Sequence, residues 1–306
     1  MDTNQFKAYA KSIFSNYETR MWKKEKAVFL DHSQSAFKQL GYDEMTILEQ
    51  RNLFGVKSRN LLVGSADADI LITAHYDTPG HTGLMMLFSP ILGSALGSML
   101  FLVLILLPDH ISAIPNWVSL VTFVISLYIT ITFFIKNKHN HNDNTSGVIG
   151  VYAMAELIAN DQELRRRCAF VLFDHEEILP GLLGSRAFAK WRKMTYPDKE
   201  DGVVINLDCI GVGNILTVMT KKNHPGWHQI ADFMAQSGYD TRKVKGSLFG
   251  TSDHAVFKNG VSLLFQKRSL LGPLYIPNVH TRRDKVCNLD EIGRLTETVC
   301  NYVKTI

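Results

Sequence analysis

The stretch ADADILITAHYDTPG, residues 66–80, decides the fold of this chain. It is an apolar run that ends abruptly in His75, Tyr76 and Asp77. Such a run is typical of a parallel strand that delivers polar groups to the carboxyl edge of an α/β sheet, where such folds place their sites. We therefore expect a functional site where this strand ends.

Acidic residues and a second histidine follow in later segments. They are Asp143 in NDNTSG, Glu176 and Glu177 in FVLFDHEE, Asp208 in VVINLDCIG and His280 in PNVHTRRD. Several of them come after apolar, strand-like runs, so one sheet edge can bring them together. Two histidines and several carboxylates have the composition of a metal site. Each motif alone is commoner as a turn or a solvated surface pair, so the prediction depends on their joint occurrence.

The remaining pattern predicts an α/β chain. Residues 4–41 have helical spacing, and NLFGVKSRNLLVG, residues 52–64, indicates a β-hairpin before a strand at 69–75. The later predicted elements are helices 146–160, 181–194, 225–238, 253–259 and 288–304, and strands 168–174, 202–208, 214–219 and 261–266. This alternation predicts a mostly parallel or mixed central sheet flanked by helices.

Two long uncharged segments lie between the first strand and the acidic motifs. Residues 83–107 and 117–135 contain no charged side chain, and as helices they would extend about 37 and 28 Å against a hydrocarbon core of about 30 Å. They predict a transmembrane helical hairpin with spans at about 84–107 and 117–135, joined by PDHISAIPN at 108–116. The alternative is a pair of buried core helices, but a helix of a soluble protein usually keeps one polar face.

Composition and charge indicate a cellular location and exclude one class of partner. No signal sequence precedes the first apolar segment, and Lys136 and Lys138 follow the second one, while the predicted hairpin loop has neither Lys nor Arg. These features predict a multi-pass cell-membrane protein with a cytoplasmic catalytic domain. Four cysteines without CxxC spacing are expected to be reduced. The net charge of +4 is not gathered into a basic stripe, so nucleic acid is not an expected partner.

Six short motifs occur in the order HYDTPG, DNTSGV, EEILPGLLGS, NLD, GTSDHAVF and VHTRRD. In this order they resemble the co-catalytic di-zinc aminopeptidase family, which includes bacterial leucyl aminopeptidases and the glutamate carboxypeptidase and transferrin-receptor relatives. The resemblance covers roughly residues 24–82 and 140–304. It implies a peptidase domain in two parts, residues 1–82 and 137–306, with the hydrophobic hairpin at 83–136 inserted between them.

The resemblance also implies a set of metal ligands. His75 and Asp208 would bind one Zn²⁺, Glu177 and His280 would bind the other, and Asp143 would bridge the two. A mixed set of imidazole and carboxylate donors suits Zn²⁺, and Mn²⁺ or Co²⁺ could also occupy it. Two metal ions about 3.5 to 4 Å apart lower the pKa of a bound water and polarise the scissile carbonyl.

Residues next to these ligands take supporting roles in the resemblance. Glu176 would act as the general base and then protonate the leaving amine. Asp77 would hold the imidazole of His75, and Asp284 would do the same for His280.

Five further positions lie in or near the motifs. Asp253 and the adjacent histidine in the SDH motif are interpreted as structural support near the site. Tyr275 would either donate a hydrogen bond to an oxyanion or only pack. Arg282 and Arg283 would either bind a substrate carboxylate or form a solvated basic turn.

These inferences predict a membrane-anchored zinc exopeptidase, an aminopeptidase that hydrolyses short peptides by metal-activated water. Carboxypeptidase or glutaminyl cyclase activity at the same site stays open, and so does a non-catalytic membrane scaffold. The presence of all five predicted ligands and of Glu176 argues against the scaffold. A transporter is disfavoured because two uncharged spans offer no polar pathway. Because the hairpin would leave and re-enter beside the metal site, the mouth of the site is expected to lie close to the membrane surface.

Overall fold

A mixed sheet lies at the centre of the computed structural model, which describes residues 4–51, 55–81, 83–106, 116–177, 181–199, 202–246 and 252–306. In these ranges the strand order is β1 (Met45–Arg51), β2 (Lys57–Val63), β4 (Cys168–Phe173), β3 (Ile70–His75), β5 (Val203–Leu207), β8 (Gly260–Arg268), β6 (Ile215–Thr220) and β7 (Thr241–Lys245), with β9 (Leu274–Tyr275) paired to β8. The four central strands β4, β3, β5 and β8 run parallel to one another. Their carboxyl ends therefore meet at one edge, as the sequence predicts.

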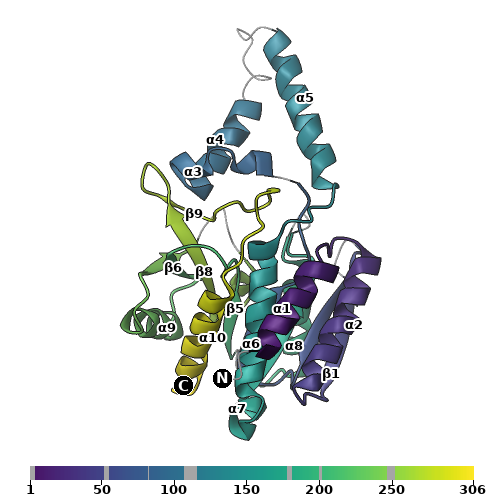
Figure 1. The fold of residues 1–306 in the computed structure, drawn as a ribbon, viewed down its shortest axis with the longest axis vertical. Helices are drawn as coiled ribbons and strands as arrows, with labels where there is room; N and C mark the ends of the chain where they lie inside the picture. The colour runs from purple at the N-terminus through teal and green to yellow at the C-terminus, as the bar shows by residue number, and fades with distance from the viewer. Residues whose placement is uncertain are drawn as a thin grey trace.

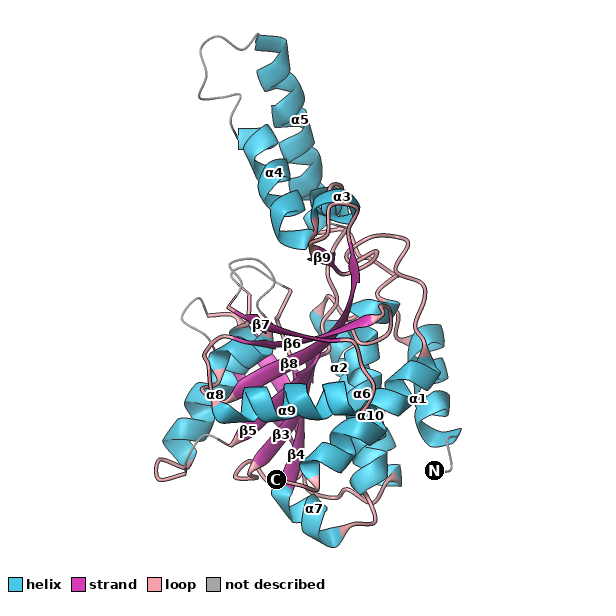
Figure 2. Cartoon of the chain, turned by 90° about the vertical axis from the view of Figure 1, so that its left-hand side faces the viewer, coloured by secondary structure: helices cyan, strands magenta, loops and turns pink. Residues whose placement is uncertain are grey.

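Helices cover both faces of the sheet (Figures 1 and 2). The larger hydrophobic core packs one face against α1 (Asn4–Asn16), α2 (Lys23–Gln39), α6 (Gly147–Ile158), α9 (Pro225–Gln236) and α10 (Leu289–Val303). A smaller core packs the other face against α8 (Leu183–Thr195). The short helices α7 (Gln162–Arg167) and η4 (Asp253–Val256) complete the body. The predicted central sheet flanked by helices is thus confirmed.

Helix α6 is apolar on nearly every side because it lies between the sheet and the outer helices. Its first residue, Gly147, allows it to begin against the end of β5. A Cβ atom at this position would lie 2.2 Å from the carbonyl oxygen of Leu207. This close approach brings the acidic segment before α6 to the end of the parallel strands.

The segment predicted as a transmembrane hairpin is built differently, and that prediction is wrong. Residues 83–106 form a 3₁₀ turn η1 (Gly83–Met86), a short helix α3 (Ser89–Leu92) and helix α4 (Ser94–Leu106). Gly93 breaks the run with a φ of 84°. Helix α4, which begins after this break, has 13 residues, and the separate helix α5 (Asn116–Phe133) has 18. Their lengths are about 20 and 27 Å, against the roughly 30 Å needed to cross a membrane.

Among the residues that the structure describes, no helix is both long and apolar enough to cross a membrane. The predicted multi-pass cell-membrane location with a cytoplasmic catalytic domain is therefore overturned, and the predicted lipid bilayer contact has no support from these helices. The predicted connection at 108–116 lies outside the described residues, apart from its last position.

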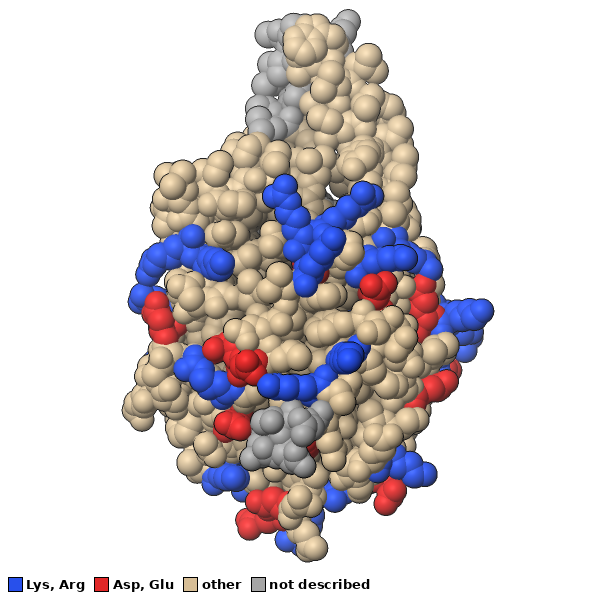
Figure 3. Space-filling view, viewed as in Figure 1, with Lys and Arg blue, Asp and Glu red and all other residues tan. Residues whose placement is uncertain are grey.

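Helices α4 and α5 contact each other and project from the body (Figures 1 and 2). The two ends of the insertion meet in an antiparallel bridge between Gly80 and Lys136. Figure 3 shows Lys and Arg side chains on the body below the projecting helices, which carry none themselves in residues 83–107 and 117–135. The insertion is therefore an apolar extension whose two chain ends lie together.

Candidate metal centre

The carboxyl ends of the central strands bring together the acidic and histidine residues singled out in the sequence. His75 is the last residue of β3, Glu176 and Glu177 come shortly after β4, and Asp208 directly follows β5. Asp143 arrives from the turn before α6. Because these elements are neighbours in the sheet or pack directly on it, the side chains converge.

Two of the groups of convergent side chains that could hold a metal ion share one residue. One consists of His75, Asp143 and Asp208, and the other of Asp143, Glu177 and His280, each with donor atoms within 4.8 Å of one another. The two groups share Asp143, whose Oδ2 lies 2.9 Å from Nε2 of His280 and whose Oδ1 lies 3.5 Å from Nε2 of His75. The two oxygens of this carboxylate thus face different histidines.

The remaining ligand candidates complete each group. Nε2 of His280 lies 3.2 Å from Oε2 of Glu177, and Nε2 of His75 lies 3.8 Å from Oδ1 of Asp208. A third group, His75 with Glu176 and Glu177, also satisfies the distance requirement. The site therefore brings together the five predicted ligands and the predicted base.

The electrostatics of this cluster favour bound cations. Burial raises the pKa of Glu176 well above its usual range, and the neighbouring carboxylate of Glu177 adds to the increase, although His75 opposes it. Burial also raises the pKa of Glu177. Burial opposes the charged form of His75, yet Glu176 and Asp143 outweigh it and raise the pKa of this imidazole well above its usual value. Buried carboxylates in excess need positive partners, and imidazole with carboxylate donors suits zinc or a similar divalent ion.

Asp77 connects the histidine and the glutamates of the site. Its two carboxylate oxygens accept hydrogen bonds from the backbone N–H groups of Glu176 (3.0 Å) and Glu177 (3.2 Å). Its Oδ1 also lies 3.6 Å from Nδ1 of His75. Asp77 therefore fixes the turn that presents both glutamates. The sequence interpretation assigns the carboxylate of Asp77 to the imidazole of His75, and that assignment stays a prediction, because Nδ1 of His75 lies at hydrogen-bonding distance from the backbone carbonyl of Asp77, at 3.2 Å.

Asp284 holds the chain segment that carries Asp143. Its carboxylate accepts hydrogen bonds from the backbone N–H groups of Asn142 (2.8 Å) and Asp143 (3.0 Å). The interpretation from sequence assigns Asp284 to the imidazole of His280, and that assignment stays a prediction. The hydrogen bonds add a second role, because they position the backbone of the shared ligand Asp143.

The sequence interpretation missed the side chains that attach the Asp143 segment to β5. Asn144 accepts a hydrogen bond from the N–H of Cys209 and donates one to the carbonyl of Leu207. Asn142 accepts one from the N–H of Gly211, and Ser146 accepts one from the N–H of Ile210. The clustering of short polar residues in NDNTS was the available signal, because such side chains commonly bond to nearby backbone.

Two buried cations from the N-terminal segment were missed as well. Nζ of Lys26 lies 2.6 Å from Oδ1 of Asp174, and both side chains are almost fully buried. The guanidinium of Arg20 is also buried and donates to the backbone carbonyl of Tyr76 and to the hydroxyl of Thr145. Both cations join the N-terminal helices to residues that flank the metal ligands.

The SDH motif lies beside the cluster. Asp253 is fully buried, and burial raises its pKa to about 7. The adjacent His254 is buried too, and burial lowers its pKa to about 4. Neither belongs to the metal-binding groups found in the described ranges, so the supporting role suggested by the sequence stays the preferred interpretation.

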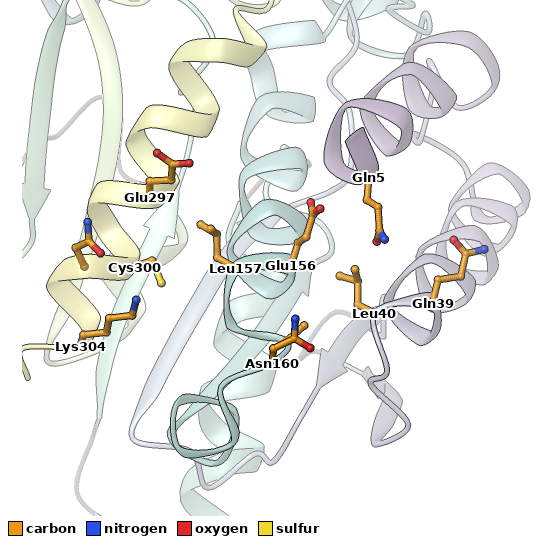
Figure 4. A pocket seen from close by; sticks show the side chains of 11 residues that line it. Gln5, Gln39, Leu40, Glu156, Leu157, Asn160, Glu297, Cys300 and Lys304 are labelled. Carbon is orange, nitrogen blue, oxygen red and sulfur yellow. The ribbon is translucent and has the colours of Figure 1, made fainter. Parts of the chain in front are cut away.

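A cavity of about 320 Å³ opens onto the cluster and is lined by His75, Asp143, Glu176, Asp208 and His280 together with mostly apolar side chains. A neighbouring cavity of about 500 Å³ is lined by Tyr275, Lys267, Arg282 and Arg283. A third cavity of about 580 Å³ lies among α1, α2, α6 and α10 (Figure 4). It shares no lining residue with the cluster, so size alone does not identify the reactive cavity.

Comparisons with known proteins agree with this description. The model of peptidase family M28 matches residues 134–303, which is more than half of the chain. A comparison with curated protein sequences returned no significant match.

Solved structures share the fold. An aminopeptidase, LapA, from Legionella pneumophila is 15% identical with a TM-score of 0.63, over 99% of this chain and 68% of that one. A glutaminyl cyclase from Bacteroides thetaiotaomicron is 14% identical with a TM-score of 0.62, over 100% and 98% of the two chains. A zinc aminopeptidase from Bacillus subtilis, BSAP, is 17% identical with a TM-score of 0.50, over 81% of this chain and 50% of that one.

A mixed α/β sheet with histidine and carboxylate ligand candidates at its carboxyl edge is the arrangement of a metallopeptidase. The family match places the chain within this class: it belongs to peptidase family M28. The resemblance to zinc aminopeptidases that the six motifs carry is thereby confirmed.

Proposed function

We propose that this protein is an aminopeptidase that removes the N-terminal residue of short peptides with the help of two zinc ions. The observation that carries the proposal is the shared ligand candidate Asp143, whose two oxygens face His75 and His280 in separate metal-binding groups. One ion would be held by His75, Asp208 and Asp143, and the other by Glu177, His280 and Asp143. When bound, such ions lower the pKa of water and polarise the scissile carbonyl.

Glu176 is the proposed general base. Its carboxylate lies at the cavity beside the ligand candidates, and Oε2 is 4.0 Å from Nε2 of His75. It would accept a proton from the attacking water while the new C–O bond forms, and donate that proton to the amine nitrogen as the C–N bond breaks. Asp77 would keep Glu176 in place through the backbone hydrogen bond to its N–H.

Glutaminyl cyclisation is the second candidate. The cavity of about 320 Å³ lies at the lower end of the range for small-ligand sites, which starts at about 300 Å³. A site of that size suits one terminal residue, whether this residue is removed or cyclised. A glutaminyl cyclase is also among the structures that share the fold, whereas carboxypeptidase activity has no comparable observation in its favour.

A substrate panel on wild-type protein and on Glu176→Gln tests the proposal. The protein is loaded with Zn²⁺, Mn²⁺ or Co²⁺, and bound metal is counted by elemental analysis. The substrates are peptides with a free N-terminus, the same peptides acetylated at the N-terminus, and a peptide that begins with glutamine. Release of a free amino acid indicates an aminopeptidase, and release of ammonia from the glutamine peptide indicates a cyclase.

We expect about two metal ions per chain and cleavage of the free peptides only. Glu176→Gln should keep the metal and lose about 10²- to 10⁴-fold in rate, because it removes the base and no ligand. Cleavage of acetylated peptides at the carboxyl end would overturn the aminopeptidase assignment. A wild type that stays inert with all three metals would revive the scaffold alternative.

A further inference from the structure

The inserted segment forms part of the reactive cavity. Ser94, Ser98 and Leu102 of α4 line the cavity that opens onto the candidate ligands, and Met86 of η1 lines it too. The three α4 residues are spaced by four, so they form one stripe along the helix. The neighbouring residue Met99 points away and is 53% exposed. One side of α4 therefore faces the site and the other faces away from it.

Several contacts hold this segment over the site. The backbone N–H groups of Leu270 and Leu271, in the turn between β8 and β9, donate to the carbonyls of Pro90 (2.9 Å) and Ile91 (3.0 Å). Figures 1 and 2 both show α3 close to β9. Gly93 approaches this turn so closely that an added Cβ would lie 2.6 Å from Cβ of Pro273. The segment is thus attached to the sheet that carries the ligands.

Contacts inside the segment and to the ligand loop reinforce this attachment. The hydroxyl of Ser98 donates a hydrogen bond to the sulfur of Met86 at 3.6 Å. A Cβ at Gly83 would lie 3.0 Å from the carbonyl oxygen of His280. The wall formed by the insertion therefore begins directly beside a candidate metal ligand.

Apolar side chains from the body contribute much of the cavity lining away from α4. Met219 and Leu264 contribute from β6 and β8, and Ile276 and Val279 contribute from the loop before His280. A charged side chain placed against these four apolar residues would lose its hydration without gaining a partner from them, which is costly. An apolar side chain of moderate size would be favoured, since its burial removes apolar surface from water.

We propose that α4 is a specificity element, in which Ser98 and Leu102 set the size of the apolar side chain that the site accepts at the substrate's N-terminal residue. This inference rests on the proposed aminopeptidase function. Ser98 is only 7% exposed and its small side chain leaves room in the middle of the stripe, whereas Leu102 occupies the position one turn further along.

Two variants on the inner stripe and one control on the outer face test this role. Ser98→Leu fills the cavity, and Leu102→Ala enlarges it. Met99→Ala removes a similar apolar side chain from the outer face of the same helix. For each variant, kcat/KM is measured on alanine, leucine and phenylalanine derivatives of one chromogenic amine.

We expect Ser98→Leu to lower kcat/KM for leucine and phenylalanine by at least about tenfold relative to alanine, because one or two methylene groups in an apolar pocket change selectivity by roughly 10- to 200-fold. Leu102→Ala should raise the phenylalanine-to-leucine ratio by a similar factor. Met99→Ala should keep the wild-type ratios. Unchanged ratios in both inner variants, or an equal change in Met99→Ala, would overturn the proposal.

A binding measurement separates this proposal from the proposed function. Metal-loaded Glu176→Gln is titrated with alaninamide, leucinamide and phenylalaninamide by calorimetry, alone and combined with each α4 substitution. If the wild type hydrolyses nothing, the aminopeptidase proposal has failed, but the amide affinities still report the size of the pocket. If none of the three amides binds, or if Ser98→Leu leaves their affinities unchanged, the proposed role of α4 is overturned, whether or not the wild type is an aminopeptidase.

Discussion

Replacing Asp77 by asparagine changes charge and hydrogen bonding at the metal centre without changing side-chain volume. The carboxylate is 1% exposed and accepts hydrogen bonds from the N–H groups of Glu176 and Glu177. An asparagine has one acceptor oxygen, so one of these N–H groups loses its partner at a cost of about 1 to 3 kcal/mol. The negative charge near Nδ1 of His75 is lost as well.

Both effects weaken the metal site. Side chains that orient a metal ligand typically contribute 10- to 100-fold to metal affinity, so Asp77→Asn should raise the Zn²⁺ dissociation constant by about that factor. Zn²⁺ affinity is measured by competition with a chromogenic chelator, and the free energy of unfolding of the metal-free protein is measured in urea. The metal-free variant should lose about 1 to 3 kcal/mol, because the unpaired N–H is present with or without metal.

Asp67→Asn is the matched control. It makes the same chemical change ten positions earlier, at a half-exposed carboxylate that accepts a hydrogen bond from Ser65. This variant should bind Zn²⁺ like the wild type, because it is remote from the cluster. Equal Zn²⁺ affinity of Asp77→Asn and wild type would refute the reasoning that Asp77 organises the centre.

Three further predictions concern stability. Lys26→Met should cost about 3 to 5 kcal/mol of unfolding free energy in urea, because it leaves the carboxylate of Asp174 buried without the Lys26 cation. Lys7→Met, at an exposed pair, should cost less than about 1 kcal/mol, and equal costs of the two variants would contradict this. Partial burial by itself raises the pKa of Glu25, but the hydrogen bond from Lys136 outweighs it and the pKa is lowered. The stability from this pair is present above the unfolded-state pKa of about 4.3 and is lost as pH falls. The free energy of unfolding of the wild type should therefore decrease relative to that of Glu25→Gln below about pH 5. Parallel curves of unfolding free energy against pH for the two proteins would exclude this contribution of the pair. Removal of metal by a chelator should lower the melting temperature reversibly, since ligands that bind only the folded state stabilise it; a melting temperature independent of added Zn²⁺ would argue against a metal centre.

Site residues could be predicted from the sequence where they lie at the end of an apolar strand, because the same local pattern that predicts the strand also predicts their place at the sheet edge. His75 ends β3 and Asp208 directly follows β5, and both strands are mostly apolar, so the place of these residues at the sheet edge could be predicted from the end of each run. The Asp143 segment could be predicted only through its resemblance to a family, because nothing local distinguishes a ligand-bearing turn from an ordinary one. Strand β7, Thr241–Lys245, was not predicted because it is a charged edge strand without an apolar face.

The insertion shows where hydrophobicity alone misleads. Its residues are as apolar as a membrane span, but Gly93 adopts a left-handed conformation and the chain turns against Pro273. Neither the break nor the contact leaves a periodic signal in the sequence, since a glycine in an apolar run is also compatible with a continuous helix. The burial of Arg20 and Lys26 could not be predicted either, because Tyr76 and Asp174, which they bind in the body, lie more than 50 residues away along the chain.

The bridge between Gly80 and Lys136 gives the insertion the character of an exchangeable cassette. Both chain ends leave the body at one point, and Gly80 lies so close to α5 that an added Cβ would be 2.1 Å from the carbonyl oxygen of Phe133. A few residues could therefore close the gap if the cassette were excised, and a cassette of different sequence could be joined at the same two positions. Each exchange would bring its own wall for the cavity while the ligand candidates on the body stayed in place, so substrate range could change independently of the hydrolytic chemistry.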